Sequence, residues 1–307
     1  MTSYPDVKRD KTLTAEEVHE FLRSPAFVGR RMQEMTDLSF VTDYLLRGSA
    51  DATGTGAIAV EEDGPLFVDD SPEVIAPGAE YPLISATDVG GALIALRKKG
   101  FDSELTDEKI ARSPRDELSR FLTRMANTMI RDFDQFGRSV IASKVTQTYT
   151  GSAWSDAKAI VSDVLKAAAK IEELELGYKP NTVVLKPSQY AAVSAAFING
   201  GALPRESGNP LLSGSVSFDY MGFSWVKSLY SPFSDPFLAD ADNLGGIATE
   251  DIKSPGYSRT EGGIEVKSWR PSGRDDNDAW RVRTRRVAVP FITGPKAGLR
   301  ITGHGLS

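Results

Sequence analysis

The sequence predicts an α+β fold built around one long helix. Apolar residues recur every three or four positions over residues 113–143, which is the spacing of one face of an α-helix. Two long alternating strands, residues 263–270 and 279–289, lie near the end of the chain. Between the long helix and these strands, residues 155–199 read as a helix, a strand and a second helix, which indicates a mixed layered domain.

The composition excludes several kinds of chemistry. No cysteine occurs among the 307 residues, so disulfides, thiolate nucleophiles and cysteine-ligated metals are excluded. The formal net charge of −6 argues against sequence-independent nucleic-acid binding as the main task, because such binding requires clustered Lys and Arg. The sequence has neither a secretory leader pattern nor a run of about eighteen apolar residues. We therefore expect folding in the cytoplasm and no membrane partner.

The first 47 residues are predicted to form an arm. Thr14 is suited to cap a short amphipathic helix, with Glu17 at the reciprocal position of a capping box. Ser24 and Pro25 are expected to end that helix. A helix of this length cannot bury its apolar face alone, so we expect the arm to lie on something larger, such as a neighbouring subunit.

Residues 48–96 are predicted to form a long two-stranded excursion. They contain Gly, Pro, Asp and Glu but no Lys or Arg, and turn residues separate short β-type runs such as residues 57–60. An isolated hairpin of this kind is marginally stable in water, so it should pack on another body. Its acidity is typical either of a solvated loop or of a surface that meets a basic partner. The candidates for such a contact are Glu61, Glu62, Asp63, Asp69 and Asp70.

The long helix is expected to begin at Ser113, as N-cap, with Pro114 in its first turn. Its length of about 45 Å requires a large sheet or other helices along its whole apolar side. That side carries Leu118, Phe121, Leu122, Met125, Met129, Phe133, Phe136 and Val140. The opposite, wetter side carries Arg120, Arg124, Asn127, Arg131 and Arg138.

The middle of the chain is predicted to alternate helices and strands. Ser155 is suited to cap a second amphipathic helix, and Gly177 to end it. Residues 181–185 have the composition of a buried strand, and Pro187 is placed to open a third helix. Residues 203–215 are expected to form a loop.

The last third is predicted to be rich in β-strands. The two long strands near the end of the chain are joined by a polar tip, residues 271–278. In the second strand Arg281, Arg283 and Arg285 point one way, as the period of two requires. This pattern is typical either of a strand with one wet face or of a subunit contact. Arg270 and Arg274, beside and within the tip, are further candidates for such a contact.

The search for catalytic, cofactor and metal sites predicts none. His19 and His304 lie near the termini and are expected to be exposed. Residues 54–59 satisfy a G-x-G-x-x-A pattern, but a polar loop precedes them and a turn follows, so nucleotide binding is not expected. Two aspartate clusters lack the spacing of a Ca²⁺ loop and favour turns: Asp240 with Asp242, and Asp275 and Asp276 with Asp278.

Two stretches, in this order, resemble the major capsid protein of tailed bacteriophages. This family has the fold named for phage Hong Kong 97, which encapsulin nanocompartments share. The first stretch, residues 105–137, is similar to the family's short helix, Ser-Pro-x-Asp segment and spine helix, and reads LTDEKIARSPRDELSRFLTRMANTMIRDFDQFG. The second, residues 180–193, is similar to its proline, strand, proline and helix segment, and reads PNTVVLKPSQYAAV.

The resemblance implies a division of the chain into four parts. These are an N-terminal arm (1–47), an extended loop (48–96), a peripheral domain (97–145 and 256–307) and an axial domain (146–255). The peripheral domain would contain the spine helix, residues 113–143, and the terminal β-hairpin. In that fold the extended loop lies over an adjacent subunit, so we expect its carboxylates to pair with arginines there. Some relatives crosslink subunits through a lysine of this loop, and none occurs here, so no crosslink is expected.

The resemblance also implies a function, which is structural rather than enzymatic and needs no cofactor. Copies of the chain would self-assemble as hexamers and pentamers into an icosahedral head around double-stranded DNA, without sequence-specific contact. A portal and a separate scaffold protein are implied partners, because the long cleaved scaffolding region of some relatives has no counterpart before the arm. The implied location is the virion capsid, after assembly in the host bacterial cytoplasm.

Two alternatives stay open at this point. An encapsulin-type nanocompartment shell has the same fold but encloses enzyme cargo instead of DNA. An α+β enzyme of unknown reaction would not form a shell at all.

Overall fold

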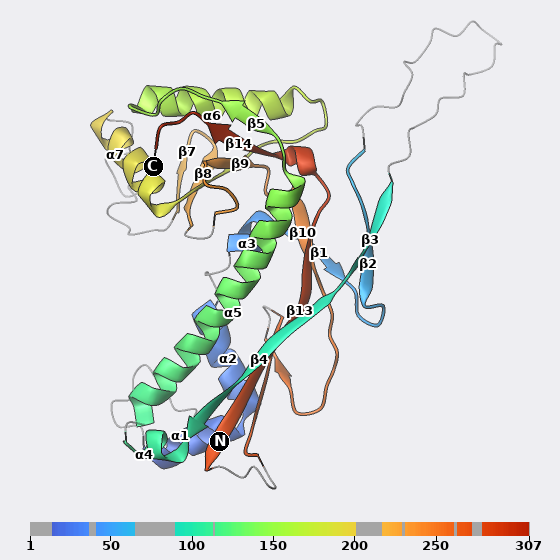
Figure 1. Ribbon diagram of the computed structural model, residues 1–307, viewed down its shortest axis with the longest axis vertical. Helices are drawn as coiled ribbons and strands as arrows, with labels where there is room; N and C mark the ends of the chain where they lie inside the picture. The colour runs from blue at the N-terminus through green and yellow to red at the C-terminus, as the bar shows by residue number, and fades with distance from the viewer. Residues whose placement is uncertain are drawn as a thin grey trace, which may run out of the picture.

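The chain folds into two sheets joined by one long helix (Figure 1). The structure is a computed structural model that describes residues 14–36, 41–64, 90–112, 114–200, 217–228, 231–260, 263–271 and 278–306. Helix α5 (Pro114–Lys144) has 31 residues and runs between the two sheets along the longer dimension of the molecule. This confirms the predicted long helix. Its predicted N-cap, Ser113, lies outside the described residues.

The predicted apolar side of α5 is largely buried. Phe136 and Val140 are half-buried. The other six predicted positions are buried: Leu118, Phe121, Leu122, Met125, Met129 and Phe133. The first half of α5 contributes to one core, and its C-terminal half to another, so a single helix links the two halves of the fold.

The first sheet is organised by one long strand. Its members are β1 (Gly48–Asp51), β4 (Arg97–Thr106), β10 (Gly245–Thr249), β11 (Ser258–Arg259), β12 (Ile264–Trp269) and β13 (Ala279–Ile292). Strand β13 pairs antiparallel with β4 over residues 279–288, with β12 over residues 281–286 and with β10 over residues 288–292. The predicted terminal hairpin is therefore confirmed as β12 and β13.

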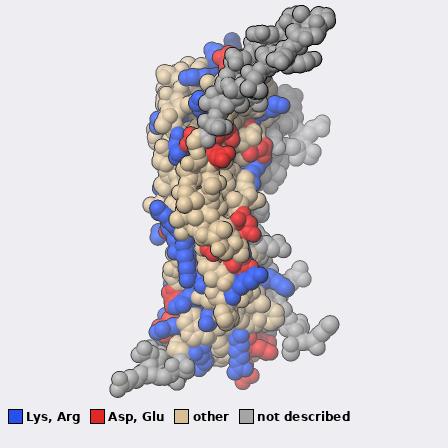
Figure 2. All heavy atoms as spheres, turned by 90° about the vertical axis from the view of Figure 1, so that its right-hand side faces the viewer, with Lys and Arg blue, Asp and Glu red and all other residues tan. Residues whose placement is uncertain are grey.

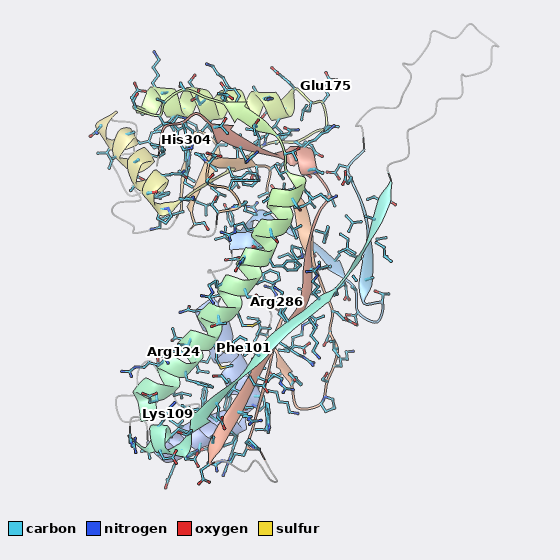
Figure 3. All side chains as sticks on the ribbon, in the orientation of Figure 1. Phe101, Lys109, Arg124, Glu175, Arg286 and His304 are labelled. Carbon is cyan, nitrogen blue, oxygen red and sulfur yellow. The ribbon has the colours of Figure 1, made fainter. Side chains whose placement is uncertain are left out.

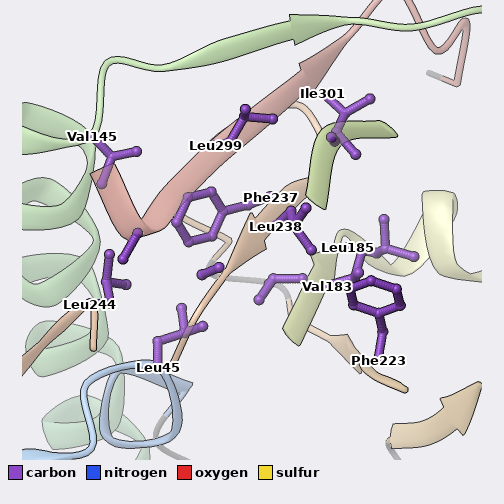
Figure 4. Packing of buried hydrophobic residues seen from close by; sticks show 14 of the residues in the cluster. Leu45, Val145, Val183, Leu185, Phe223, Phe237, Leu238, Leu244, Leu299 and Ile301 are labelled. Carbon is purple, nitrogen blue, oxygen red and sulfur yellow. The ribbon is translucent and has the colours of Figure 1, made fainter. Parts of the chain in front are cut away.

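The second sheet lies at the other end of α5, under helices α6 (Ala157–Glu172) and α7 (Pro187–Asn199) (Figure 1). Its strand order is β5-β14-β9-β6-β8-β7. Their bounds are β5 (Thr148–Thr150), β6 (Thr182–Leu185), β7 (Ser217–Tyr220), β8 (Phe223–Lys227), β9 (Phe237–Ala239) and β14 (Gly298–Thr302). Leu185, Phe237 and Leu299 are fully buried in its core (Figure 4).

Two strands cross between the halves of the chain. Strand β10 lies within residues 146–255, the predicted axial domain. It nevertheless belongs to the first sheet, where it pairs with β1 and β13. Strand β14 follows the terminal hairpin, through the 3₁₀ turn η1 (Pro295–Ala297), and pairs with β5 and β9 of the second sheet. The two sheets are consequently tied together by backbone hydrogen bonds as well as by α5.

The N-terminal helices pack on the chain itself. These helices are α1 (Ala15–Arg23), α2 (Pro25–Thr36) and α3 (Val41–Leu45). The capping box of Thr14 and Glu17 is confirmed, and α1 ends at Ser24 as predicted. Buried residues of α1 and α2 share a core with α5, β12 and β13. The apolar face of the described part of the arm is therefore buried against its own subunit.

Two short elements flank the region before α5. Helix α4 (Asp107–Arg112) confirms the predicted short helix. Strands β2 (Ala57–Glu61) and β3 (Gly91–Ala95) form a separate antiparallel pair, which confirms a two-stranded excursion in the residues that the structure describes. The predicted loop 203–215 and most of the polar tip, residues 272–277, lie outside the described residues.

The predicted limits of α6 are wrong at both ends. Asp156 is its N-cap, because its carboxylate accepts from the backbone N–H of Ala159, whereas Ser155 precedes the cap. The helix ends at Glu172 rather than near Gly177, which has the expected positive φ of 79° but lies in the following loop.

In the described residues no helix is long and apolar enough to cross a bilayer.

Helix α3 packs closely against α5 at Gly137. A Cβ at this position would lie 2.2 Å from Cγ2 of Thr42, which is itself buried at the start of α3. We therefore predict that Gly137→Ala lowers the free energy of unfolding by about 1–3 kcal/mol through overpacking. In an exposed helix the same change raises stability by up to about 1 kcal/mol, so the sign is diagnostic. Urea unfolding of the unassembled chain measures it.

The control is Gln135→Ala, an exposed position on the same turn of α5. It should change stability by no more than about 0.5 kcal/mol. A stabilised Gly137→Ala variant would contradict the close packing of α3 on α5.

Candidate subunit-contact surfaces

The hairpin β2–β3 is attached to the first sheet by one of its faces. Val60 is buried against Val289 and Phe291 of β13, and Ile58 and Ile94 pack on the same cluster. The other face presents Leu93, which is 79% exposed, to solvent. The hairpin is thus held against the first sheet by one face and exposes Leu93 on the other.

Two of the predicted loop carboxylates hold this base in place. The carboxylate of Glu62 lies 2.9 Å from Nζ of Lys144, the last residue of α5. Asp63 donates its backbone N–H to the carbonyl of Thr293 at 2.8 Å and accepts from the hydroxyl of Tyr178 at 3.0 Å. Both residues therefore have partners within their own subunit.

The remaining loop carboxylates are placed differently. Glu61 is exposed and has no ion pair with the described residues. Asp69 and Asp70 lie outside the described residues. On the face that carries the hairpin, acidic side chains gather beside the base of the loop (Figure 2).

The hydroxyl of Tyr178 donates a hydrogen bond to the carboxylate of Asp63. Burial of the phenol and the adjacent carboxylate of Asp63 both raise its pKa well above the usual value. The hydroxyl therefore stays protonated across the physiological range and keeps donating to the loop base.

The predicted arginines of the hairpin are largely engaged within the subunit. Nη2 of Arg270 donates to both carboxylate oxygens of Asp107, at 2.7 and 2.6 Å. Arg283 is paired with Asp102 of β4, which lies directly opposite in the strand register, and this guanidinium lowers the pKa of the Asp102 carboxyl. Arg274 lies outside the described residues.

Arg285 and Arg281 differ in burial although they lie on one strand. Arg285 is 5% exposed, pairs with Glu265 of β12 and lies 3.8 Å from the ring centre of Tyr257. Arg281 is half-buried and lies opposite Glu104 of β4. Ion pairs and rings of the same chain thus cover much of this arginine row.

A second row of arginines lies on the outer side of α5. We call Arg124, Arg131 and Arg138 the arginine stripe. Their spacing of seven residues places successive side chains about 10.5 Å apart along one side of the helix. Arg124 and Arg131 are exposed and Arg138 is half-buried. Within the described part of the chain none of the three has an ion-pair partner, unlike Arg120, which pairs with Glu117.

A buried cluster of charges lies at the junction of α3, α5 and β13. Arg286 of β13 packs 3.7 Å from the ring centre of Phe133 and reaches the carboxylate of Asp43 at 3.3 Å. Asp134 of α5 is 1% exposed and accepts from the backbone N–H groups of Thr42 and Val41. It therefore caps α3 from a neighbouring helix.

Burial shifts the pKa values of this cluster. It raises the pKa of Asp134 and of Asp43 above the usual 3.8, partly offset by hydrogen bonds and by Arg286. It lowers the pKa of Arg286, which the two carboxylates oppose. The cluster is a structural clamp rather than a site for a ligand, because its members bind one another.

The expectation that both histidines are exposed is wrong. His304 is 5% exposed, packs on Trp154, and lies 3.3 Å from Asp235 through Nε2. His19 is half-buried and accepts at Nδ1 from the indole N–H of Trp280. Proximity to a chain end did not indicate exposure, because both terminal segments fold back onto the sheets.

Asp240 and Asp242 serve the turn chemistry that the sequence favoured. The buried carboxylate of Asp240 accepts from the backbone N–H of Lys179 and from the amide of Asn243. Asp242 pairs with Arg47. Among the described residues no group of three or more His, Asp or Glu could hold a metal ion, and Asp275 and Asp276 lie outside them.

Comparisons with known proteins agree on one family and one fold. Residues 90–301 match the family model described as phage capsid protein. This match extends from the start of β3 into β14, whereas α1, α2 and α3 precede it. No curated protein matches the chain.

Solved capsid and encapsulin structures have similar folds at low sequence identity. The capsid structure of cyanophage P-SCSP1u superposes with a TM-score of 0.60 at 13% identity, covering 85% of this chain and 87% of that chain. A Mycobacterium phage Che8 structure gives 0.53 at 16%, covering 86% and 91%. The holo-SrpI encapsulin complex from Synechococcus elongatus gives 0.50 at 13%, covering 83% and 84%. The chain therefore has the Hong Kong 97-like capsid fold that the resemblance predicted.

The buried carboxyl of Asp134 generates a prediction about pH. Because its folded pKa is raised, its contribution to stability is present at low pH and is lost as pH rises through the folded pKa. We predict that the amide of Asp134→Asn keeps an acceptor for Thr42 and removes this loss. Between about pH 4 and about pH 7, the urea midpoint of the variant should fall less than that of the wild type.

Asp132→Asn is the matched control, since it removes an exposed carboxylate from the same helix. Equal pH slopes for Asp134→Asn and the wild type would rule out a raised pKa at Asp134.

The contact between Tyr178 and Asp63 generates a second prediction. Tyr178→Phe removes one hydrogen bond to a carboxylate, so the backbone N–H of Asp63 should exchange with deuterium about tenfold faster. Exchange elsewhere in the sheet should stay unchanged. Tyr149→Phe removes a hydroxyl from β5 and is the control. An unaltered rate at Asp63 would mean that Tyr178 does not hold the loop base.

Proposed function

We propose that this chain, which belongs to the phage capsid protein family, assembles with copies of itself into the icosahedral head of a tailed bacteriophage around double-stranded DNA. The chain is a major capsid protein with a structural role. The observation that carries the proposal is the family match over residues 90–301, which includes α5, the terminal hairpin and every strand of the second sheet but the last residue of β14. Assembly and DNA enclosure are the steps proposed here.

The shape of the subunit supports assembly with copies of itself. The fold is elongated, and the hairpin β2–β3 projects from its side (Figure 1) and exposes Leu93. Elongated subunits with projecting parts gain cover from neighbours when they close into a symmetric particle. Each contact is modest, and the number of contacts in a closed shell makes the particle stable.

We propose the same division of parts for this subunit that the resemblance implied. The arm is 1–47, the extended loop 48–96, the peripheral domain 97–145 with 256–307, and the axial domain 146–255. The two separate cores support the division, and strands β10 and β14 are exchanged across it.

Two surfaces are proposed to meet neighbouring subunits. One is the acidic extended loop, through Glu61, Asp69 and Asp70, while Glu62 and Asp63 hold its base. The other surrounds the tip of the terminal hairpin, through Arg270, Arg274 and Arg281. Arg283 pairs with Asp102 but is exposed and stays a candidate. Arg285 is buried against Glu265, so it is not proposed to contact a neighbouring subunit.

Partners and location follow from the same proposal. The shell would consist of hexamers and pentamers, with a portal at one vertex and a separate scaffold protein during assembly in the host bacterial cytoplasm. The DNA would be enclosed without sequence-specific contact, which suits a subunit with a net charge of −6.

A nanocompartment shell is the second candidate function. It is favoured by the similarity to an encapsulin complex over 83% of this chain. Under this alternative the shell would hold an enzyme instead of DNA.

Electron microscopy of the purified protein, with nucleic-acid analysis of the particles, tests the proposal. Closed particles of uniform diameter are expected, and particles from infected cells should contain nuclease-protected double-stranded DNA. Particles with protein cargo and no DNA would favour the encapsulin alternative. A stable monomer or dimer under all assembly conditions would contradict a shell function.

The proposed loop contact gives a further prediction. Neutralising Glu61, Asp69 and Asp70 to their amides should lower particle yield about tenfold, because each exposed pair contributes up to about 1 kcal/mol. The monomer should keep its unfolding midpoint. The control is Glu108→Gln, which removes an exposed carboxylate from α4. Full particle yield from the triple variant would show that these carboxylates make no essential contact.

A further inference from the structure

The arginine stripe is a local surplus of positive charge on an acidic protein. Residues 118–144 of α5 contain five Arg and Lys and two Asp, so their net charge is +3, whereas the whole chain has −6. Of the two carboxylates, Asp134 is buried and Asp132 lies 3.0 Å from Nζ of Lys99. Neither opposes the stripe, whose three members have no ion-pair partner among the described residues. The outer side of α5 therefore presents cations to solvent.

The side chains beside the stripe are of the kinds that bind phosphate oxygens. Thr123, Asn127 and Gln135 are exposed on α5 and carry hydroxyl and amide donors. Arg131 and Gln135 also line a cleft of about 410 Å³ between α5 and β4, together with Lys98. Arginine, lysine, threonine, asparagine and glutamine are side chains through which proteins contact the nucleic-acid backbone. The chemistry of this surface thus fits a chain of phosphates.

The same side of α5 lacks the anchors of a protein interface. In the described part of this helix no large apolar side chain is exposed. Contacts between proteins are centred on aromatic and apolar side chains that become buried, and charged groups lie at the rim. A row of arginines among small polar groups therefore fits a polyanion better than a second protein subunit.

The stripe and the hairpin β2–β3 belong to opposite faces of the first sheet. Along β13, Ile292 shares a core with Ile141 of α5, whereas the adjacent Phe291 packs against the hairpin. Successive side chains of a strand point to opposite faces, so α5 and the hairpin cover opposite sides of β13. Figure 3 shows Arg124 pointing away from β4 and β13. The subunit consequently has one side with the stripe and another with the hairpin, as the wall of a shell has an inner and an outer side.

We propose that the arginine stripe faces the inside of the shell and contacts the phosphates of the enclosed double-stranded DNA. The inference rests on the proposed function and deepens it, because it names the surface of the subunit that meets the DNA. Contacts with the backbone alone carry no sequence information, as a shell that encloses a whole genome requires. The seven-residue spacing of the arginines, about 10.5 Å, is close to three base-pair steps of about 3.4 Å along a duplex.

The stripe offers few contacts, so binding by one subunit is weak and sensitive to salt. Three phosphate contacts release about three counterions, and the logarithm of the association constant should fall with a slope of about −2.7 against the logarithm of the salt concentration. The many subunits of a shell repeat the contact along the DNA. The acidic remainder of the chain repels DNA, which confines the contact to the stripe.

Salt-dependent binding of a duplex tests the contact. The probe is a short fluorescent DNA duplex of random sequence, and its anisotropy is measured with the unassembled full-length chain. The wild type should bind with a slope of about −2.7, and Arg131→Gln should weaken binding and reduce the slope by about 0.9. Lys158→Gln is the matched control, since it removes an exposed cation from α6, and it should leave the slope unchanged.

Two results of this measurement would overturn the proposal. One is a slope that Arg131→Gln leaves unchanged. The other is tighter binding of a poly-glutamate chain with the same number of charges, which would indicate an acidic protein segment as the partner. A duplex should bind more tightly than poly-glutamate, because it carries one charge per about 1.7 Å of its axis and an extended peptide one per about 3.3 Å.

Crosslinking in the assembled particle tests the orientation. The chain contains no cysteine, so a photoreactive group can be attached to a single introduced thiol. Asn127→Cys places it on the exposed side of α5 between Arg124 and Arg131, and Leu93→Cys places it on the hairpin as a control. In DNA-filled particles the label at position 127 should crosslink to DNA, whereas the label at position 93 should not.

The outcomes separate this inference from the proposed function. DNA-filled particles without a crosslink at position 127, or with equal crosslinking at both positions, would overturn the inference alone. Wild-type particles without DNA, or the absence of particles, would instead overturn the proposed function.

Discussion

The burial of α5 is the constraint on which this fold depends. A helix of 31 residues is stable in water only if its apolar side is covered along its length. The cover comes from segments far apart in the sequence: α1 and α2 from the first forty residues, and β12 and β13 from the last fifty. Its far end enters the core of the second sheet instead, where Ile141 is buried with Leu244 and Leu299. The two sheets cannot be understood as independent domains, because one helix supplies part of each core.

The junction near Gly137 extends this constraint to the acidic loop. The missing side chain of Gly137 lets α3 approach α5, and Asp134 of α5 then accepts from the backbone N–H groups at the start of α3. Strand β1 follows α3 directly and enters the first sheet beside β10, so the start of the loop is fixed by the same contact. About two turns further along α5, its last residue, Lys144, holds Glu62. Helix α5 therefore positions the root of the loop.

The sequence predicted those elements whose signals are local. The period of α5, the capping box at Thr14 and the buried strand β6 each follow from neighbouring residues. Helix α2 was not predicted, because Pro25 is typical both of the end of one helix and of the first turn of the next. The burial of His304 could not be predicted, since it results from the pairing of β14 with β5 and β9. The partners of the candidate contact residues could not be predicted for the same reason. Arg283 meets Asp102 only because β4 pairs with β13 in one particular register.

That register decides which charges remain for other molecules. Period-two patterning correctly placed Arg281, Arg283 and Arg285 on one side of a strand, but it says nothing of what the adjacent strands present to them. Glu265 and Asp102 lie opposite two of these arginines, whereas Arg124, Arg131 and Arg138 on the outer side of α5 have no ion-pair partner among the described residues. Residues 48–96 supply carboxylates and no cation of their own. The register of the strands, and not the sequence period alone, therefore separates the charges that hold the subunit together from those that stay in contact with water.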